Sequence, residues 1–313
     1  MARLRIATLG MVSLVVAACG SGGASLAPTT GPATQVVTPA PPSAAPTQDA
    51  CATENLETVT ADTLTIATDN PAFPPYFEGR EGGNTEPWDP EWGDPTTGEG
   101  FESATAYAIA EELGFTEDQV TWVPIKFNNS FAPGPKDFDL FIGQVTFREE
   151  RAENADLSAG YYFGNQTVVV MADGEFADAT TLTELKAAEL GAQVGTTSLS
   201  TIEDVIQPTA PAGVYDTTDD AIEAMTNGQI DGVVVDLPTA FFITNVQIEG
   251  GAIVGQIGED AGAEPEHFSL VLELDSSLTS CVDAAIAAMD AAGTLDDLVA
   301  EWLPDATVPE LQP

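Results

Sequence analysis

Apolar residues in the first half of the chain form short runs separated by one segment of helical periodicity. Residues 64–68, 120–125 and 138–145 are mainly apolar and flanked by polar residues, a pattern typical of buried strands. Residues 103–113 place apolar side chains at helical spacing, and Gly114 follows as a helix stop. Strand, helix and strand in alternation predict a parallel sheet covered by helices.

The second half of the chain repeats this alternation. Short apolar runs again predict strands, and periodic segments predict helices. The expected strands are 167–171, 191–194, 230–236 and 268–273, and the expected helices are 181–188, 200–206, 219–227, 281–291 and 294–302. Because no short repeat is visible, two α/β lobes are the expected product of this pattern.

The N-terminus has the features of an export signal. Arg3 and Arg5 precede an uncharged, mostly apolar run at 6–18, which is shorter than the ~20 residues that a membrane-spanning helix needs. Residues 1–18 therefore predict a secretory signal peptide. The run ends Val-Ala-Ala before Cys19, which resembles a bacterial lipobox and implies a diacylglycerol-modified Cys19. The alternative is a soluble secreted protein in which Cys19 is incidental.

A segment of Gly, Ser, Ala, Pro and Thr follows at 20–50 and carries almost no charge. It has too little apolar surface to offset the entropy of ordering, so residues 19–50 predict the lipidated cysteine and a disordered tether. The rest, 51–313, suffices for one large domain or two smaller ones.

The charge of the chain is strongly negative, with 50 Asp and Glu against 8 Lys and Arg and a net charge of −42. Such a charge repels phosphates and excludes nucleic acid as a natural partner. The acidic residues are dispersed, as on a solvated surface. High-salt adaptation is one interpretation, and steering of cationic ligands into a cleft is another.

Two cysteines remain once Cys19 is assigned to the lipid. Cys51 and Cys281 make an even pair in an oxidising compartment, which favours a disulfide over two buried thiols. The bond would tie the N-terminal edge of the domain to its C-terminal helix.

Several short motifs occur in a characteristic order. They are Thr68-Asp69, Gly100-Phe101-Glu102, Phe138-Asp139, Thr146 with Arg151, Leu157-Ser158-Ala159-Gly160-Tyr161-Tyr162, Gly195-Thr196-Thr197, Asn227-Gly228-Gln229-Ile230-Asp231, Asp236, and Gly293-Thr294-Leu295 before Trp302. In this order and spacing, residues 64–302 resemble the polar-amino-acid solute-binding proteins of ABC importers, the group of the histidine- and glutamine-binding proteins.

The resemblance implies an α/β fold of two lobes, each with a mostly parallel sheet and flanking helices, joined by two crossover strands. Lobe 1 would comprise 51–162 and 258–313, and lobe 2 would comprise 163–257. It also implies a small ligand, most simply an amino acid, bound between the lobes of a monomer and delivered to the permease of an ABC importer. No cofactor or metal is expected.

Arg151 is the predicted partner of the ligand carboxylate, because a guanidinium binds a carboxylate through two parallel hydrogen bonds. A surface ion pair with Glu149, Glu150 or Glu153 is the alternative. Asp236 ends a buried apolar strand, where a ligand ammonium would satisfy its charge. The alternative for Asp236 is a cap toward Thr239.

Thr196 and Thr197 lie between a predicted strand and helix, where free N–H groups attract an anion, although a plain N-cap is the simpler explanation. By resemblance, Thr146 would add a hydroxyl contact to the carboxylate and Asp69 would contact the ligand side chain. A turn before Asn70-Pro71 is the alternative role of Asp69.

Phe73 falls where the family stacks an aromatic ring on the ligand, with Phe127 facing it, although isolated aromatics are more often core residues. Gln144 and Arg148 depart from the small or hydroxyl residues usual at their positions, which leaves the ligand's identity open. Residues 78–99 form a longer segment than usual, either a rim over the cleft or a surface loop.

Two other classes of protein compete with this interpretation. An enzyme on the same fold, such as a dehydratase, is one, but the single histidine, His267, excludes His-based triads and metal sites. A ligand-binding partner of a membrane sensor is the other. The sequence contains no Asp-x-Asp-x-Asp-Gly calcium loop.

Overall fold

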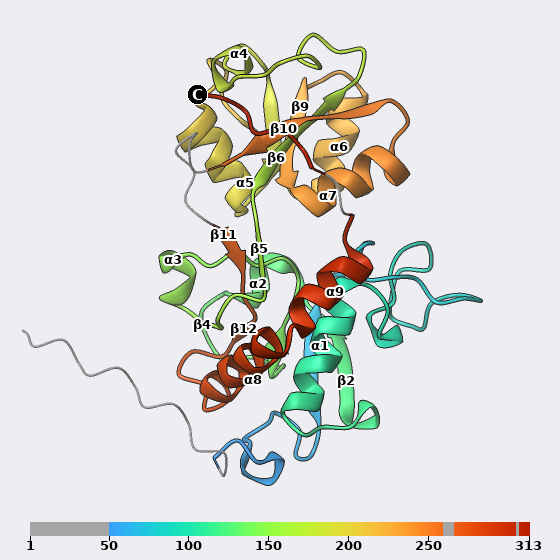
Figure 1. Ribbon diagram of the computed structural model, residues 1–313, viewed down its shortest axis with the longest axis vertical. Coiled ribbons are helices and arrows are strands. Elements are labelled where there is room, and N and C mark those ends of the chain that lie inside the picture. The colour runs from blue at the N-terminus through green and yellow to red at the C-terminus, as the bar shows by residue number, and fades with distance from the viewer. Residues whose placement is uncertain (1–49, 259–265, 305–306) are drawn as a thin grey trace, which may run out of the picture. The chain divides into compact units, whose positions relative to one another are not determined.

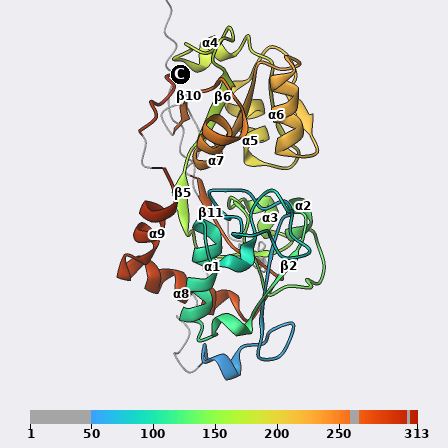
Figure 2. The same ribbon diagram turned by 90° about the vertical axis from the view of Figure 1, so that its right-hand side faces the viewer.

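A computed structural model of the protein describes residues 50–258, 266–304 and 307–313 (Figures 1 and 2). The predicted signal peptide, Cys19 and the tether up to residue 49 lie outside the described residues. Within them, no helix is both long enough and apolar enough to cross a membrane.

Lobe 1 is built on a five-stranded sheet of order β2-β1-β3-β12-β4. Its strands are β1 (Leu64–Thr68), β2 (Val120–Pro124), β3 (Leu140–Phe141), β4 (Asp156–Leu157) and β12 (Val271–Leu272). The long helices α1 (Phe101–Glu112), α8 (Thr279–Ala292) and α9 (Thr294–Trp302) lie against one another beside this sheet (Figure 1). All five residues of β1 are buried, so this strand is the centre of the lobe's core.

Lobe 2 is built on a second five-stranded sheet, of order β10-β6-β9-β7-β8. Its strands are β6 (Gln166–Met171), β7 (Leu190–Gln193), β8 (Gly213–Tyr215), β9 (Gly232–Asp236) and β10 (Gly251–Ile257). Its helices are α4 (Leu182–Leu185), α5 (Thr197–Ser200), α6 (Thr218–Thr226) and α7 (Leu237–Phe242), with π-helical turns at Thr201–Ile206 and Ile243–Gln247. The apolar strands β6 and β9 contribute to two separate core clusters, because successive side chains point to opposite faces.

A short antiparallel ladder joins the two lobes. β5 (Tyr162–Gly164) pairs with β11 (Glu266–Phe268), as the resemblance implies for the crossover strands. Short helices complete lobe 1: α2 (Phe127–Ser130), α3 (Glu149–Ala152), and 3-10 turns at Thr53–Asn55, Pro95–Thr97 and Glu117–Gln119. The two-lobed α/β fold expected from the sequence is confirmed.

The sheets are more mixed than predicted. In lobe 1, β1 runs parallel to β2 and β3, whereas β12 runs antiparallel to β3 and β4. In lobe 2, β7 runs parallel to β8 and β9, whereas β6 runs antiparallel to β9 and β10. The antiparallel strands β6 and β12 directly follow the crossover strands in the chain, so they enter each sheet against the direction of its parallel strands.

Several predicted elements are shorter than expected. The strand predicted at 138–145 pairs only at Leu140–Phe141, because Gln144 adopts a left-handed conformation with φ of 51° and turns the chain. The strand predicted at 268–273 divides into β11 and β12, since its partners change from the crossover ladder to the sheet of lobe 1. The helix predicted at 181–188 is limited to Leu182–Leu185, and most of 200–206 is the π-helical turn.

The C-terminal tail corrects the predicted boundary of lobe 1. Residues 258–313 were expected to belong to lobe 1, yet residues 307–313 lie on lobe 2. Glu310 bridges Gln256 of β10, Gln312 bridges Thr181, and Leu311 is buried in a lobe 2 core cluster. Burial of the apolar Leu311 side chain holds the tail there.

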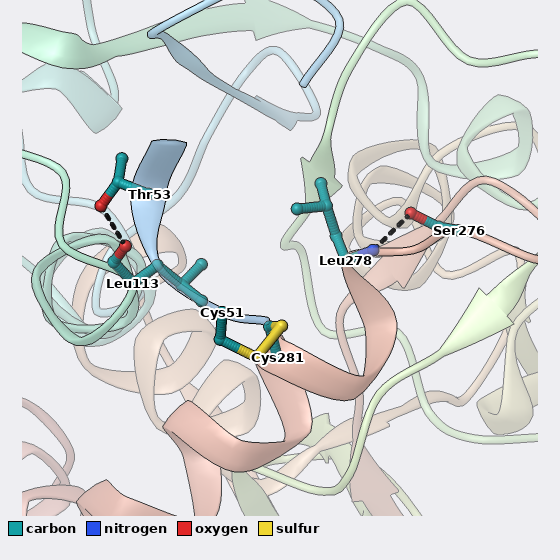
Figure 3. Close-up of a disulfide and its surroundings, with 6 residues drawn as sticks. All are labelled: Cys51, Thr53, Leu113, Ser276, Leu278 and Cys281. Carbon is teal, nitrogen blue, oxygen red and sulfur yellow. Dashed lines mark hydrogen bonds between the residues drawn. A yellow bond between two sulfur atoms is a disulfide. The ribbon is translucent and has the colours of Figure 1, made fainter. Parts of the chain in front are cut away.

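The structure contains the predicted disulfide (Figure 3). Cys51 lies before the first 3-10 turn and Cys281 lies in the first turn of α8, with 5.5 Å between their Cα atoms. The hydroxyl of Thr53 donates to the carbonyl of Leu113 at the end of α1, 2.9 Å away. These two contacts attach the start of the folded region to two helices of lobe 1.

Candidate ligand-binding site

A cavity of about 490 Å³ lies between the two lobes. Its lining includes all nine residues that the sequence singles out as ligand contacts: Asp69, Phe73, Phe127, Gln144, Thr146, Arg151, Thr196, Thr197 and Asp236. A second depression of similar volume, beside β8 and α6, contains none of them. The loops that follow the parallel strands of both sheets bring these distant segments together.

Arg151 lies on the short helix α3 and is buried, with 8% of its surface exposed. Its guanidinium donates to the carbonyl of Thr146 at 2.5 Å and to that of Gly195 at 2.9 Å. The rings of Phe131 and Phe127 lie 4.6 and 5.4 Å from it. Burial, and secondarily the charge of Arg148, lowers the pKa of Arg151 to about 10, so it remains a cation at neutral pH.

Arg151 does not form the surface ion pair considered as its alternative. Within the described residues the ion pairs are Arg80–Asp94 and Arg148–Glu266. The two groups to which its guanidinium donates, the carbonyls of Thr146 and Gly195, are neutral. The positive charge is therefore available to an anion in the cavity.

The sequence left two roles open for Thr196 and Thr197, an N-cap and a contact to an anion, and the two residues differ in their surroundings. Thr196 is the N-cap of α5: its Oγ1 accepts the N–H of Leu199 at 3.2 Å and donates to the carbonyl of Gln193 at 2.7 Å. Thr197 is buried, and its Oγ1 lies 3.3 Å from Oγ1 of Thr146. A hydroxyl pair from the two lobes thus meets inside the cavity.

Asp236 ends β9 and accepts a hydrogen bond from Nε2 of Gln166 at 2.8 Å. Its side chain makes no N-cap hydrogen bond to α7, so the predicted alternative role as a cap is not realised. Burial, and next the charge of Glu266, raises the pKa of Asp236 to about 7. The carboxylate is thus poised to ionise when a cation approaches it.

Asp69 and Gln144 are held by local hydrogen bonds at the cavity wall. Asp69 accepts the N–H of Asn70 at 2.8 Å and of Phe127 at 3.0 Å, and burial raises its pKa. The backbone N–H of Gln144 donates to Glu102 Oε1 at 2.8 Å, and its side-chain amide donates to the other oxygen of Glu102. Asp69 therefore combines the turn role with a position in the cavity.

Two functional candidates were missed from the sequence. Glu266 of β11 pairs with Arg148, and its Oε2 accepts Nε2 of Gln166 at 2.8 Å and Oγ1 of Thr197 at 3.3 Å. Gln166 links Glu266 to Asp236. In so acidic a chain a single glutamate does not stand out in the sequence. The only sequence feature that pointed to this region was the unusual Arg148.

The long segment 78–99 is fixed beside the cavity. The ring of Trp92 lies 5.3 Å from that of Phe73 in lobe 1 and 5.7 Å from that of Phe242 in lobe 2, measured between centroids. The buried carboxylate of Asp94 accepts from Thr85, Thr96 and Arg80, which folds the segment on itself. The segment therefore forms a rim that meets both lobes.

The fold and this interlobe cavity define a two-lobed solute-binding protein. Residues 83–305 match the bacterial extracellular solute-binding proteins, family 3, and the chain belongs to this family. It is 25% identical over 211 residues to the arginine-binding extracellular protein ArtP of Bacillus subtilis, covering 65% of this chain and 77% of that protein.

Two further similarities agree with this assignment. The L-cystine-binding protein TcyJ of Escherichia coli K12 is 25% identical over 232 residues, 74% of this chain and 79% of that protein. Among solved structures, an ancestral arginine-binding protein bound to arginine has 24% identity and a TM-score of 0.61, covering 78% of this chain and 99% of that chain.

Proposed function

We propose that this protein is a lipid-anchored extracellular solute-binding protein that captures an amino acid in the interlobe cavity and delivers it to an ABC importer. The observation that carries the proposal is the pair Arg151 and Asp236, which line one cavity with opposite charges. An amino-acid head group needs one cation for its carboxylate and one anion for its ammonium.

The contacts around Arg151 suit a carboxylate. Its guanidinium is buried against two phenylalanine rings, where a charge-assisted hydrogen bond is stronger than in water. The hydroxyl of Thr146 lies in the same cavity, beside that of Thr197, and is positioned to supply an additional donor. Together they form a site for an anionic group between the lobes.

Asp236 suits the ligand ammonium. It is half-buried, its side chain accepts a hydrogen bond from the neutral amide of Gln166, and no cation pairs with it within the described residues. An ammonium would supply the missing positive charge and favour the ionised carboxylate. The relatives named above bind arginine and cystine, which share this zwitterionic head group.

Binding and closure are coupled in this arrangement. Arg151 and Thr146 belong to lobe 1, whereas Thr197 and Asp236 belong to lobe 2. A ligand that contacts all four groups stabilises the closed arrangement, because an open one lacks half of these contacts. The closed, loaded protein is the form proposed to meet the permease as a monomer.

The ligand assignment is tested by thermal unfolding of the purified domain in the presence of each amino acid. Specific binding to the native state raises the melting temperature by mass action. We expect at least one amino acid to do so, with one-site stoichiometry in calorimetry. If the only ligands lack a carboxylate, the amino-acid assignment fails. Chemical turnover of the bound compound would instead indicate an enzyme on this fold.

The anchor is tested separately by Cys19→Ser in the full chain. The variant is expected to leave the membrane fraction for the medium, or to retain its signal peptide. Unchanged membrane fractionation would contradict lipidation at Cys19. Co-purification of a permease with the loaded protein tests delivery, and co-purification of a receptor kinase instead would indicate a sensor partner.

A further inference from the structure

More charged side chains line the cavity than the head group of an amino acid can contact. Its carboxylates are Asp69, Asp216, Asp219 and Asp236, and its cations are Lys126 and Arg151. The head group engages Arg151 and Asp236 in the proposed function. Lys126 lies close enough to Asp69 to stabilise its ionised form. Asp216 and Asp219, both on lobe 2, form no ion pair with any residue that the structure describes.

Asp219 is positioned by the start of α6 but is not needed to cap it. The capping box of α6 is completed by Thr217 and Asp220, whose side chains satisfy each other's backbone N–H groups. Asp219 Oδ1 instead accepts Nε2 of Gln247, 2.7 Å away, and both residues line the cavity. A neutral amide orients this carboxylate without cancelling its charge.

Asp89 of the rim segment lies next to the lobe 1 wall of the cavity. Its backbone N–H donates to Oδ1 of Asn70, 3.1 Å away, and Asn70 lines the cavity. The side-chain amide of Asn84 holds the carbonyls of Asp89 and Trp92 at 2.5 and 2.7 Å. The rim segment therefore carries a half-buried carboxylate at a fixed place beside the cleft.

The surroundings of Asp219 disfavour its negative charge. Burial raises the pKa of Asp219, and the charges of Asp220 and then of Asp89 raise it further. Drawing the lobes together without a cation therefore increases repulsion between like charges. A positive group on the ligand would convert this repulsion into attraction on both sides.

We infer that the ligand has a cationic side chain, a guanidinium or an ammonium, held between Asp219 of α6 and Asp89 of the rim segment. This inference rests on the proposed function, in which the head group occupies Arg151 and Asp236 and leaves the side chain to the remaining charged groups of the cavity. A neutral side chain leaves the two carboxylates facing each other, and an anionic one adds a third negative charge.

The test is calorimetric titration of the purified domain with L-arginine, L-lysine, L-glutamine and L-glutamate. Wild type is compared with Asp219→Asn, Asp89→Asn and the double variant. Two controls remove one negative charge elsewhere: Glu223→Gln on the exposed side of α6, and Glu91→Gln in the rim segment. Thermal unfolding of each variant verifies that it is folded.

Arginine or lysine is expected to bind wild type more tightly than glutamine and glutamate. Asp219→Asn should weaken the cationic ligand about tenfold or more, as expected when a charged hydrogen-bond partner is lost. Asp89→Asn should weaken it about threefold or more. Both controls should stay within about threefold of wild type for every ligand, and glutamine binding should not weaken in Asp219→Asn or Asp89→Asn.

Two results overturn the inference. One is a wild type that prefers a neutral or acidic amino acid. The other is a loss of arginine or lysine affinity that is no greater in Asp219→Asn and Asp89→Asn than in Glu223→Gln and Glu91→Gln. Either result leaves the amino-acid site intact, whereas failure of all amino acids to bind contradicts the proposed function itself.

Discussion

Arg148 and Glu266 form an ion pair across the crossover region, with 3.0 Å between Nη2 and Oε1. Arg148 precedes α3 in lobe 1, and Glu266 opens β11. The second oxygen of Glu266 accepts from Gln166 and Thr197 of lobe 2. The ion pair therefore connects lobe 1 to two side chains that line or support the cavity, which explains an arginine where the family usually has a small hydroxyl residue.

Replacing Arg148 by Gln should destabilise the protein, because the side chain of Glu266 is only 9% exposed and would lose its cation. We expect a loss of about 1–3 kcal/mol in the free energy of unfolding. The double variant with Glu266→Gln should recover part of that loss. Urea unfolding of the four proteins gives the coupling energy, and Glu150→Gln, an exposed change nearby, is the control. A coupling energy near zero would show that the pair contributes nothing.

Arg151→Ala should greatly weaken binding of the amino acid that the thermal screen identifies. Removing one partner of a buried charge pair typically costs ~2–5 kcal/mol, or roughly 30-fold to several thousand-fold in affinity. Arg151→Lys should restore little, since one ammonium cannot reproduce the planar fork that also binds the carbonyls of Thr146 and Gly195. Calorimetry on folded variants measures both. Binding of Arg151→Ala within about threefold of wild type would remove this residue from the site.

Asp236→Asn should discriminate between ligands. An amino acid loses its ammonium partner in this variant, whereas the matching deaminated carboxylic acid does not. We expect the affinity for the amino acid to fall sharply and the affinity for the deaminated analogue to stay the same. Equal losses for both compounds would mean that Asp236 shapes the cavity but does not bind the ammonium.

Ligand affinity should rise with pH up to about neutrality. Loss of solvation raises the pKa of Asp236 to about 7, so the free protein holds a proton that an ammonium must displace. Affinity should therefore fall toward tenfold per pH unit below about 7. Calorimetry in buffers of different ionisation enthalpy should detect proton release at pH 6. Asp236→Asn should abolish this release, and persistence of it would assign the proton elsewhere.

The same pKa shift has the opposite effect on the stability of the ligand-free protein. A carboxyl group whose pKa is higher folded than unfolded stabilises the fold in its protonated form, and this contribution is lost as the pH rises through the folded pKa. Asp236 and Glu102, both shifted to about 7 chiefly by burial, should therefore contribute less stability at pH 8 than at pH 5. The difference in unfolding free energy between wild type and Asp236→Asn should change in that direction. No change between these pH values would contradict the assignment.

Removing the disulfide should lower stability by about 5 kcal/mol, because Cys51 and Cys281 are separated by 230 residues and the bond restricts a long loop in the unfolded chain. Urea unfolding of Cys51→Ser/Cys281→Ser against wild type measures the loss. Wild type with reductant should match the double variant. Recovery of two alkylatable thiols from native, unreduced protein would contradict the bond in solution.

Local sequence patterns were sufficient for much of the fold. The predicted bounds of β1, α1, α8 and α9 agree with the structure to within two residues. Their apolar patterns are local, and a glycine follows α1 and α8 as a stop. The ligand contacts expected from the motif resemblance also line one cavity. Short motifs succeed here because each sits in a loop at the end of a strand, where the fold brings loops together.

Tertiary structure alone decided the rest. Leu311 pairs the C-terminal tail with lobe 2, and β12 enters the sheet of lobe 1 antiparallel, although neither segment shows this locally. The importance of Glu266 and Asp219 was likewise hidden among 50 acidic residues. A carboxylate acquires a distinctive role only when folding buries it and places particular partners beside it. Both conditions depend on residues far away in the chain, so no local pattern encodes them.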